Sequence, residues 1–171
     1  MNVDRLTKIA EWLEAGGDRG TSKEHPNIEF TMEFGVKMDL APVLEDDEEE
    51  QPMLPEDTNL SACNTACCIA GAAVMMFGQP KKLVEDAFFD EGIDPSGEMD
   101  LSWPRVQREA SELLELQPWE ADRLFTPQHY TVNDEYLELA EFDDPDWAAR
   151  TIRHFIATGV VDWEATEEPQ L

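Results

Sequence analysis

Hydrophobic and polar residues alternate along one stretch of the chain, between positions 28 and 40. From Ile28 onward every even position up to Leu40 is apolar, and most positions between them are charged or polar. This period of two predicts a β-strand with one apolar and one solvated face, bent at Gly35. A lone strand is not stable. We therefore expect a second short strand beside residues 28–34, and residues 160–163 are the candidate.

Other segments carry apolar residues at helical spacing, every three or four positions. Longer helices are expected at 3–15, 103–116 and 145–158, and shorter ones near 81–89, 118–125 and 134–140. Asn2, Ser102 and Asp144 precede the longer segments and are residue types that cap a first helical turn. Gly159 follows the last segment and is typical of a helix end.

Residues 65–77 differ from these segments because they are apolar on almost every side. A helix without a polar face is buried, so this segment is predicted to be the central core helix. The whole pattern predicts an α+β fold dominated by helices, with the buried helix 65–77 at its centre and one or two short strands. A length of 171 residues suits a single domain, 1–171.

The net charge of the chain limits which partners it is expected to bind. The chain has 12 Lys and Arg against 39 Asp and Glu, a formal net charge of −27. Such a chain is not expected to bind nucleic acid or an anionic membrane surface directly. No run of about 18 apolar residues predicts a membrane span. Residues 41–57 contain eight acids and no base, so we expect an acidic mobile loop or insertion there; without it the charge is still −19.

Three cysteines, Cys63, Cys67 and Cys68, are the only cysteines of the chain. Their odd number and the acid-interrupted N-terminal segment favour a reducing cytoplasm over an oxidising compartment. Metal binding, a nucleophilic thiol and a reversible Cys63–Cys68 disulfide are open alternatives, but the spacing to the three His residues is uninformative. We expect the cysteines to pack a tight helix start. No metal, cofactor or catalytic residue is predicted, and the chain is not expected to be an enzyme.

Basic residues give one further pattern, at 150, 153 and 154. Arg150, Arg153 and His154 form a stripe at helical spacing, which we expect to pair with neighbouring acids such as Asp146. The helix pair at 103–125 invites comparison with a DNA-reading helix-turn-helix. Its outer positions are acidic, however, so an ordinary helical hairpin is the interpretation we favour.

The segment Cys63-Asn64-Thr65-Ala66-Cys67-Cys68-Ile69-Ala70-Gly71-Ala72-Ala73 resembles a family of small uncharacterised phage and prophage proteins. Their pattern is Cys-Gly-Thr-x-x-Cys-Ile/Leu-Ala-Gly-x-Ala, and Asn64 replaces its Gly. Weaker similarity covers Phe30-Thr31-Met32, the helix pair around 110–125 and the segment 157–163. The acidic segment 41–57 interrupts the matching blocks. The resemblance implies a phage origin, and with it a role against host defence or in host takeover.

The charge also suggests how such a protein would act. Duplex DNA carries about one charge per 1.7 Å, so −27 corresponds to about 46 Å of duplex. We therefore expect a DNA-mimic-like inhibitor that binds a basic nucleic-acid-handling or defence protein in the host cytoplasm. A virion or assembly protein, which forms homo-oligomers, and a salt-adapted acidic domain are the alternatives. The residues expected to face the partner are Glu45, Asp46, Asp47, Glu48, Glu49, Glu50, Glu109, Glu112, Glu115, Asp143, Asp144 and Asp146.

Overall fold

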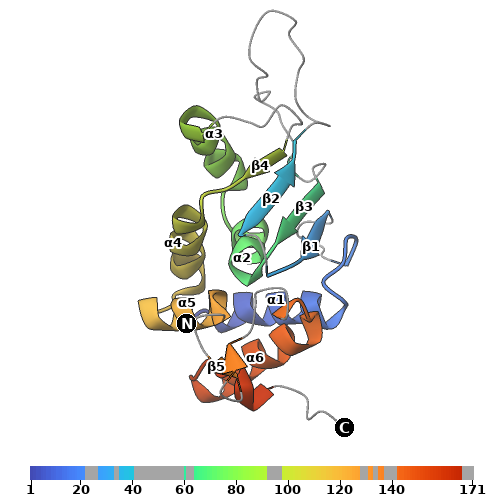
Figure 1. Ribbon diagram of the computed structural model, residues 1–171, viewed down its shortest axis with the longest axis vertical. Coiled ribbons are helices and arrows are strands. Elements are labelled where there is room, and N and C mark those ends of the chain that lie inside the picture. Colours follow the sequence, from blue (N-terminus) through green and yellow to red (C-terminus); the bar gives the residue numbers. More distant parts are fainter. Residues whose placement is uncertain are drawn as a thin grey trace, which may run out of the picture.

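The structure is a computed structural model of the 171 residues (Figure 1). It describes residues 1–21, 27–32, 35–40, 60, 64–91, 98–127, 131–132, 135–136 and 142–166. The acidic segment 41–57, with Glu45 to Glu50, lies outside the described residues. Within the described part, no helix is both long and apolar enough to cross a bilayer.

The described fold is α+β and dominated by helices, as the sequence predicts. Its helices are α1 (Val3–Glu14), α2 (Ile69–Phe77), α3 (Pro80–Glu91), α4 (Trp103–Leu114), α5 (Pro118–Phe125), α6 (Pro145–Thr158) and the 3₁₀ helix η4 (Glu164–Thr166). Its strands are β1 (Ile28–Phe30), β2 (Val36–Asp39), β3 (Asn64–Cys67), β4 (Glu98–Asp100), β5 (Thr131–Val132) and β6 (Glu135–Tyr136).

The predicted strand over residues 28–40 is two strands, β1 and β2, of one four-stranded sheet. The strand order is β1-β3-β2-β4, with β1 parallel to β3 and β2 antiparallel to both β3 and β4. The chain therefore reverses between β1 and β2, and β3 fills the space between them. The alternation itself is confirmed, because Ile28, Met32, Val36, Met38 and Leu40 are all buried.

The strand β3 corrects the prediction of a helix over 65–77. Residues 65–67 pair with β1 on one side and β2 on the other, and the helix α2 begins only at Ile69. Small apolar residues suit a buried strand as well as a buried helix, so periodicity alone does not separate the two. The prediction of a central buried helix holds for α2, whose residues from Ile69 to Met75 are all buried.

The segment 160–163 is not a strand, and it does not pair with β1. Val161 and Trp163 are buried instead against the helices. The indole of Trp163 lies edge-on to Phe142 and Trp147, at ring-centroid distances of 5.4 and 5.6 Å. Trp147 Nε1 donates to Trp163 O at 2.9 Å, and Trp163 Nε1 donates to Arg123 O at 3.0 Å. Aromatic packing and these two hydrogen bonds hold the segment in place of strand pairing.

The predicted helix over 134–140 is also wrong where the structure describes it. Residues 135 and 136 form the strand β6, which pairs with β5 in a two-stranded ribbon. The remaining predicted helices are present. Asn2 Oδ1 accepts from Arg5 N at the start of α1, and Asp144 caps α6, as expected. Ser102 occupies the cap position of α4 without a side-chain cap bond, and α4 ends at Leu114.

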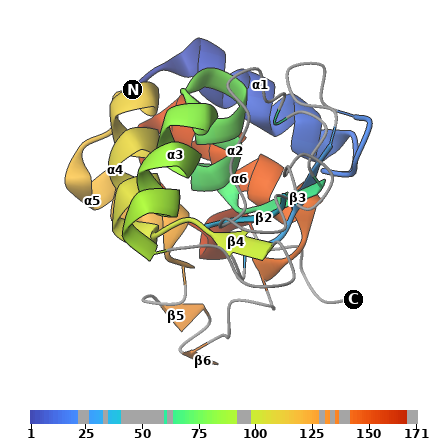
Figure 2. The ribbon, with the colours of Figure 1, turned by 90° about the horizontal axis from the view of Figure 1, so that it is seen from above.

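Helices α1 and α6 lie at one end of the sheet, and helices α2, α3 and α4 lie along it. In Figure 1, α1 and α6 cross the lower end of the sheet, while α3 and α4 lie along the side next to β4. Figure 2, seen from above, shows α2 between α4 and the sheet. α1 packs chiefly on α6, and α2 chiefly on α4. Apolar side chains of these four helices and of the sheet form one core. The candidate site includes residues of α4 that lie outside this core.

Candidate partner-binding surface

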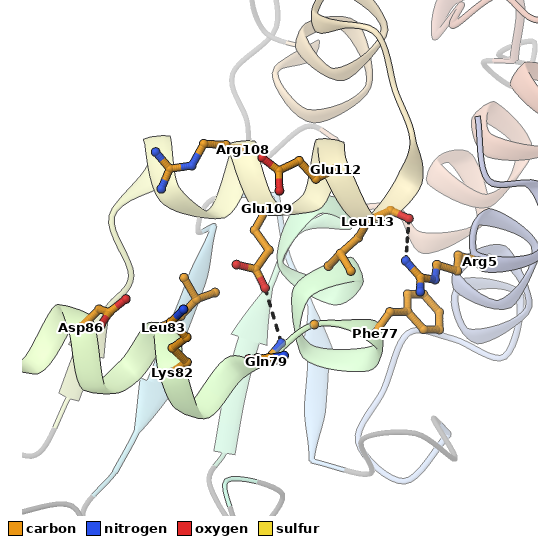
Figure 3. A pocket seen from close by; sticks show the side chains of 11 residues that line it. Arg5, Phe77, Gln79, Lys82, Leu83, Asp86, Arg108, Glu109, Glu112 and Leu113 are labelled. Carbon is orange, nitrogen blue, oxygen red and sulfur yellow. Dashed lines mark hydrogen bonds between the residues drawn. The ribbon is translucent and has the colours of Figure 1, made fainter.

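Three of the predicted partner-facing acids belong to α4 and its C-cap: Glu112 is exposed, Glu109 is half-buried and directed toward Gln79 (Figure 3), and Glu115 is exposed just past the helix end. The opposite side of this helix, with Val106, Ala110 and Leu114, is buried. Glu109 and Glu112 are three residues apart on the helix, an axial rise of about 4.5 Å, and Glu115 follows three residues later in the left-handed conformation that ends the helix. We call these three residues the α4 acidic row. Hydrophobic periodicity predicted the buried side of this helix, whereas Glu109 on the expected outer side is half-buried.

The α4 acidic row is fixed at its two ends. Glu109 is half-buried, and its Oε1 accepts from Gln79 N at 3.4 Å. Glu115 is exposed at the C-cap of α4 with φ of 54°, and its Oε1 accepts from Asn2 Nδ2 at 3.2 Å. Asn2 N also donates to Leu114 O at 2.7 Å, so the start of α1 closes the end of α4. The positions of these carboxylates are therefore set by neighbouring elements.

The predicted acids around the start of α6 have a different environment. Asp143 accepts from Thr31 Oγ1 at 2.9 Å and from Met32 N. Asp144 Oδ1 accepts from Asp146 N at 2.9 Å and from Trp147 N at 3.0 Å, which caps the helix. These two carboxylates are used for structure, although both are exposed. Asp146 is exposed in the first turn of α6.

The structure does not join the two acidic groups into one row. α4 lies along the left side of the molecule in Figure 1, whereas α6 lies across its lower end. The expected surface is therefore divided among separate elements. Of the described candidates, the α4 acidic row and Asp146 are those that a partner can reach without opening the bonds that close α6 and its preceding loop.

A groove between α3 and α4 borders the α4 acidic row (Figure 3). Its volume is about 460 Å³. The charged residues that line it are Arg5, Lys82, Asp86, Arg108, Glu109 and Glu112. Three cations and three carboxylates give the groove no single sign of charge. The sequence analysis did not single out this groove, because Lys82 and Arg108 come together only through the packing of α3 beside α4.

One end of the groove is closed by α1. Arg5 Nη1 donates to Leu113 O at 2.8 Å, and the Arg5 guanidinium lies 5.6 Å from the ring centroid of Phe77. Figure 3 shows this arrangement at the right end of the groove. Lys8 Nζ lies over the same ring, at 5.8 Å. Cation–π contacts hold both α1 cations against Phe77 of α2, and the hydrogen bond of Arg5 to Leu113 O also ties it to the C-terminal end of α4.

Sequence reasoning missed an exposed aromatic residue, Trp119, in the first turn of α5. Its side chain is 53% exposed, whereas Trp12, Trp147 and Trp163 are buried. The turn is held by a capping box in which Glu120 Oε2 accepts from Gln117 N at 2.7 Å. The signal was in the sequence. Residues 121, 124 and 125 form the buried side of this helix, and residue 119 falls on the opposite side.

The cysteines that the structure describes are core residues, as predicted. Cys67 and Cys68 are buried free thiols. Burial raises the pKa of Cys67 well above its ordinary value and that of Cys68 to about 11. The Cys68 thiol donates weakly to Gly35 O, with the two atoms 3.8 Å apart. Such thiols are poor nucleophiles, which argues against the reactive alternative for these two. Cys63 lies outside the described residues.

The basic stripe on α6 pairs with an acid at Arg153, as expected, but that acid is Glu14 and not Asp146. Arg153 makes a two-pronged ion pair with Glu14 of α1, at 2.8 and 3.0 Å. Arg150 Nε donates to Thr166 O at 2.9 Å. The predicted acceptor Asp146 lies on the same helix, but Glu14 comes within reach because α1 packs along α6. The Arg153 guanidinium lowers the pKa of Glu14.

Comparisons with known proteins add no relative to this description. No family model matches the chain, and neither a curated protein nor a solved structure is significantly similar to it.

Proposed function

We propose that this protein acts by binding a basic partner, as a DNA-mimic-like inhibitor of a nucleic-acid-handling or defence protein of a phage host. The α4 acidic row is the observation that carries the proposal. Glu109 and Glu112 lie on one helix at an axial rise of about 4.5 Å, the same order as the axial rise of about 3.4 Å per phosphate of one DNA strand, and Glu115 follows at the C-cap of that helix. A surface of this kind offers a phosphate-binding protein an alternative to its nucleic acid.

The charge balance supports the same proposal. With 39 acidic and 12 basic residues, one-to-one pairing leaves at least 27 carboxylates without a cation of the same chain. Every acidic side chain that the structure describes is exposed or half-buried. The field of these carboxylates therefore reaches solvent. It would steer basic proteins toward the surface and would weaken as salt screens it.

The test is capture of binding proteins from a nuclease-treated bacterial lysate on the immobilised protein. We expect basic DNA- or RNA-binding proteins to be retained and then released by a competing DNA duplex or by rising salt. Recovery of this chain alone, or of capsid proteins alone, would overturn the proposal and favour assembly. Folding only in molar salt would instead favour the salt-adapted alternative.

A pair of matched triple variants tests the α4 acidic row itself. The first replaces Glu109, Glu112 and Glu115 with Gln, which keeps the acceptor oxygens for Gln79 and Asn2. The second neutralises Asp18, Asp100 and Glu164, which are exposed acids on other elements, and so removes the same charge. We expect the first variant to lose most of the captured protein and the second to retain it. Equal losses would show that total charge, and not this row, determines binding.

A further inference from the structure

Two basic residues that line the groove between α3 and α4 are left without a partner by the fold. The side chains of Lys82 on α3 and Arg108 on α4 are exposed, and neither makes an ion pair or a hydrogen bond with a residue that the structure describes. The other described basic residues all have contacts, among them Arg5, Lys8, Arg19, Lys81, Arg150 and Arg153. In a chain with 39 acids and 12 bases, unpaired cations are the exception, and both line one groove.

Unpaired carboxylates line the same groove, which has a volume of about 460 Å³. Figure 3 shows Arg108 and Glu112 on α4, above the groove. Lys82 and Asp86 belong to α3, below it. Asp86 and Glu112 are exposed like the two cations, and their side chains have no hydrogen bond or ion pair among the described residues. Each helix therefore offers one cation and one carboxylate to whatever enters the groove.

Apolar side chains lie between these charges. Leu83 of α3 is buried, and Leu113 of α4 is half-buried, and both line the groove between the two helices (Figure 3). Water and salt screen an ion pair less beside apolar side chains than on an open surface. An external charged group is therefore held more strongly in the groove than at an isolated exposed residue.

The two cations weaken the attraction of this surface for a basic protein unless they meet carboxylates of that protein. Complementary interfaces place opposite charges against each other, and like charges in contact cost affinity. A partner that covers the α4 acidic row also reaches the groove, because Glu109 and Glu112 line it. Its surface therefore needs acidic groups opposite Lys82 and Arg108. A small anion is a poorer match, because Asp86 and Glu112 would repel it.

We propose that the α3–α4 groove docks a segment of the basic partner that carries acidic as well as basic side chains, with its carboxylates on Lys82 and Arg108. The inference rests on the proposed function and deepens it, because it describes a partner with acidic residues inside its basic surface. Arginine binds a carboxylate through two parallel hydrogen bonds, and lysine adds a point charge. The α4 acidic row supplies general attraction, and the groove fixes the register and selects among basic proteins.

A double charge reversal, Lys82→Glu with Arg108→Glu, tests the inference against simple attraction. The probe is the basic protein retained from the lysate, purified and titrated against the full chain at fixed salt. The variant is more acidic than the wild type, so a surface that acts through total charge alone would bind the probe as tightly or more tightly. We expect the affinity to fall at least about tenfold instead, because the new carboxylates face those of the partner. Both positions are exposed, so the fold should be unchanged.

The matched control is Arg19→Glu with Lys81→Glu. It makes the same change in charge at two residues that do not line the groove. Each of the two loses only a surface ion pair, with Glu29 and Glu85 respectively. We expect the control to bind the probe at least as tightly as the wild type does. A loss of affinity in the control equal to that of the groove variant would overturn the inference.

A second readout detects the carboxylates of the partner directly. A carbodiimide joins an amine to an adjacent carboxylate, so Lys82 should crosslink to an Asp or Glu of the probe, as identified by mass spectrometry of the peptides. Lys81, the next residue in the chain but not part of the groove lining, should crosslink less. Undiminished binding by the groove variant, with no crosslink at Lys82, would overturn the inference and leave the proposed function standing. Retention of no basic protein from the lysate would overturn both.

Discussion

The segment β3–α2 and the acidic surface differ in what fixes their residues. In β3–α2 the distinctive residues are buried, and packing accounts for each of those described: Cys67 and Cys68 fill the core, and Gly71 allows a close approach of backbone. On the surface the same residue type has several roles. Asp144 caps a helix, Glu14 joins two helices, and Glu112 faces solvent. The residues of the Cys-containing motif are therefore explained by the packing of the core. Residues for partner binding are expected among exposed side chains that make no structural contact.

The largest expected effect comes from Gly71→Ala in α2. A Cβ at this position would lie 1.9 Å from Gly35 O and 2.6 Å from Cys67 Cβ. Alanine is otherwise favoured over glycine in a helix by about 1 kcal/mol, so the sign of the effect is diagnostic. We expect the free energy of unfolding, measured with urea, to fall by more than about 3 kcal/mol. An increase would show that α2 does not pack on the 35–36 backbone as described.

The second largest expected effect is on the alkylation rate of the two thiols of the β3–α2 segment. With Cys63→Ser as background, alkylation by iodoacetamide at pH 8 reports on Cys67 and Cys68. A pKa of about 11, against 9.0 for an ordinary thiol, lowers the thiolate population of Cys68 about a hundredfold. We expect native-state alkylation to be slower than in urea by at least that factor. Rapid reaction of the native protein would restore a nucleophilic or redox role and remove the contrast with the surface.

The sequence predicts the local features of this fold better than its long-range contacts. Local signals held: caps at Asn2 and Asp144, proline at helix starts, and the apolar periodicity of α1, α4 and α6. Long-range pairing did not. Nothing local to residues 64–67 specifies a strand between β1 and β2, and nothing local to 160–163 reveals the aromatic contacts with Phe142 and Trp147.

Long-range contacts also limit what the sequence predicts about the candidate site. Periodicity correctly placed Glu112 on the exposed side of its helix, whereas Glu109 is half-buried and accepts from Gln79 N, and Glu115 follows the end of the helix. It could not separate Asp143, whose carboxylate binds the distant Thr31 and Met32, from Asp146 nearby. A helical wheel could have shown that Trp119 is exposed, but no local pattern predicts the hydrogen bond between Asn2 and Glu115, which are 113 residues apart.

A pair of variants at the start of α6 separates structural from free carboxylates. Asp144→Ala removes the acceptor for Asp146 N and Trp147 N, and we expect it to cost about 1 kcal/mol of unfolding free energy. Asp146→Ala, two residues away, removes an exposed first-turn acid and should change stability by less than about 0.5 kcal/mol. Urea denaturation of both variants gives the comparison. Equal costs would contradict the assignment of the cap to Asp144.

The smallest effect concerns Glu14, the acid that ties α1 to α6 through Arg153. Because this pair is largely exposed, Glu14→Gln should cost only a few tenths of a kcal/mol, and less in high salt. The sign of its pH dependence is fixed, since Arg153 lowers the pKa of Glu14 in the folded state. The contribution is present above the ordinary pKa of 4.5 and is lost as the pH falls through the lowered folded value. The stability curves of wild type and variant should therefore differ at neutral pH and converge in acid. A constant difference would mean that Glu14 acts through packing and not through charge, which would place it with the buried segment in this comparison.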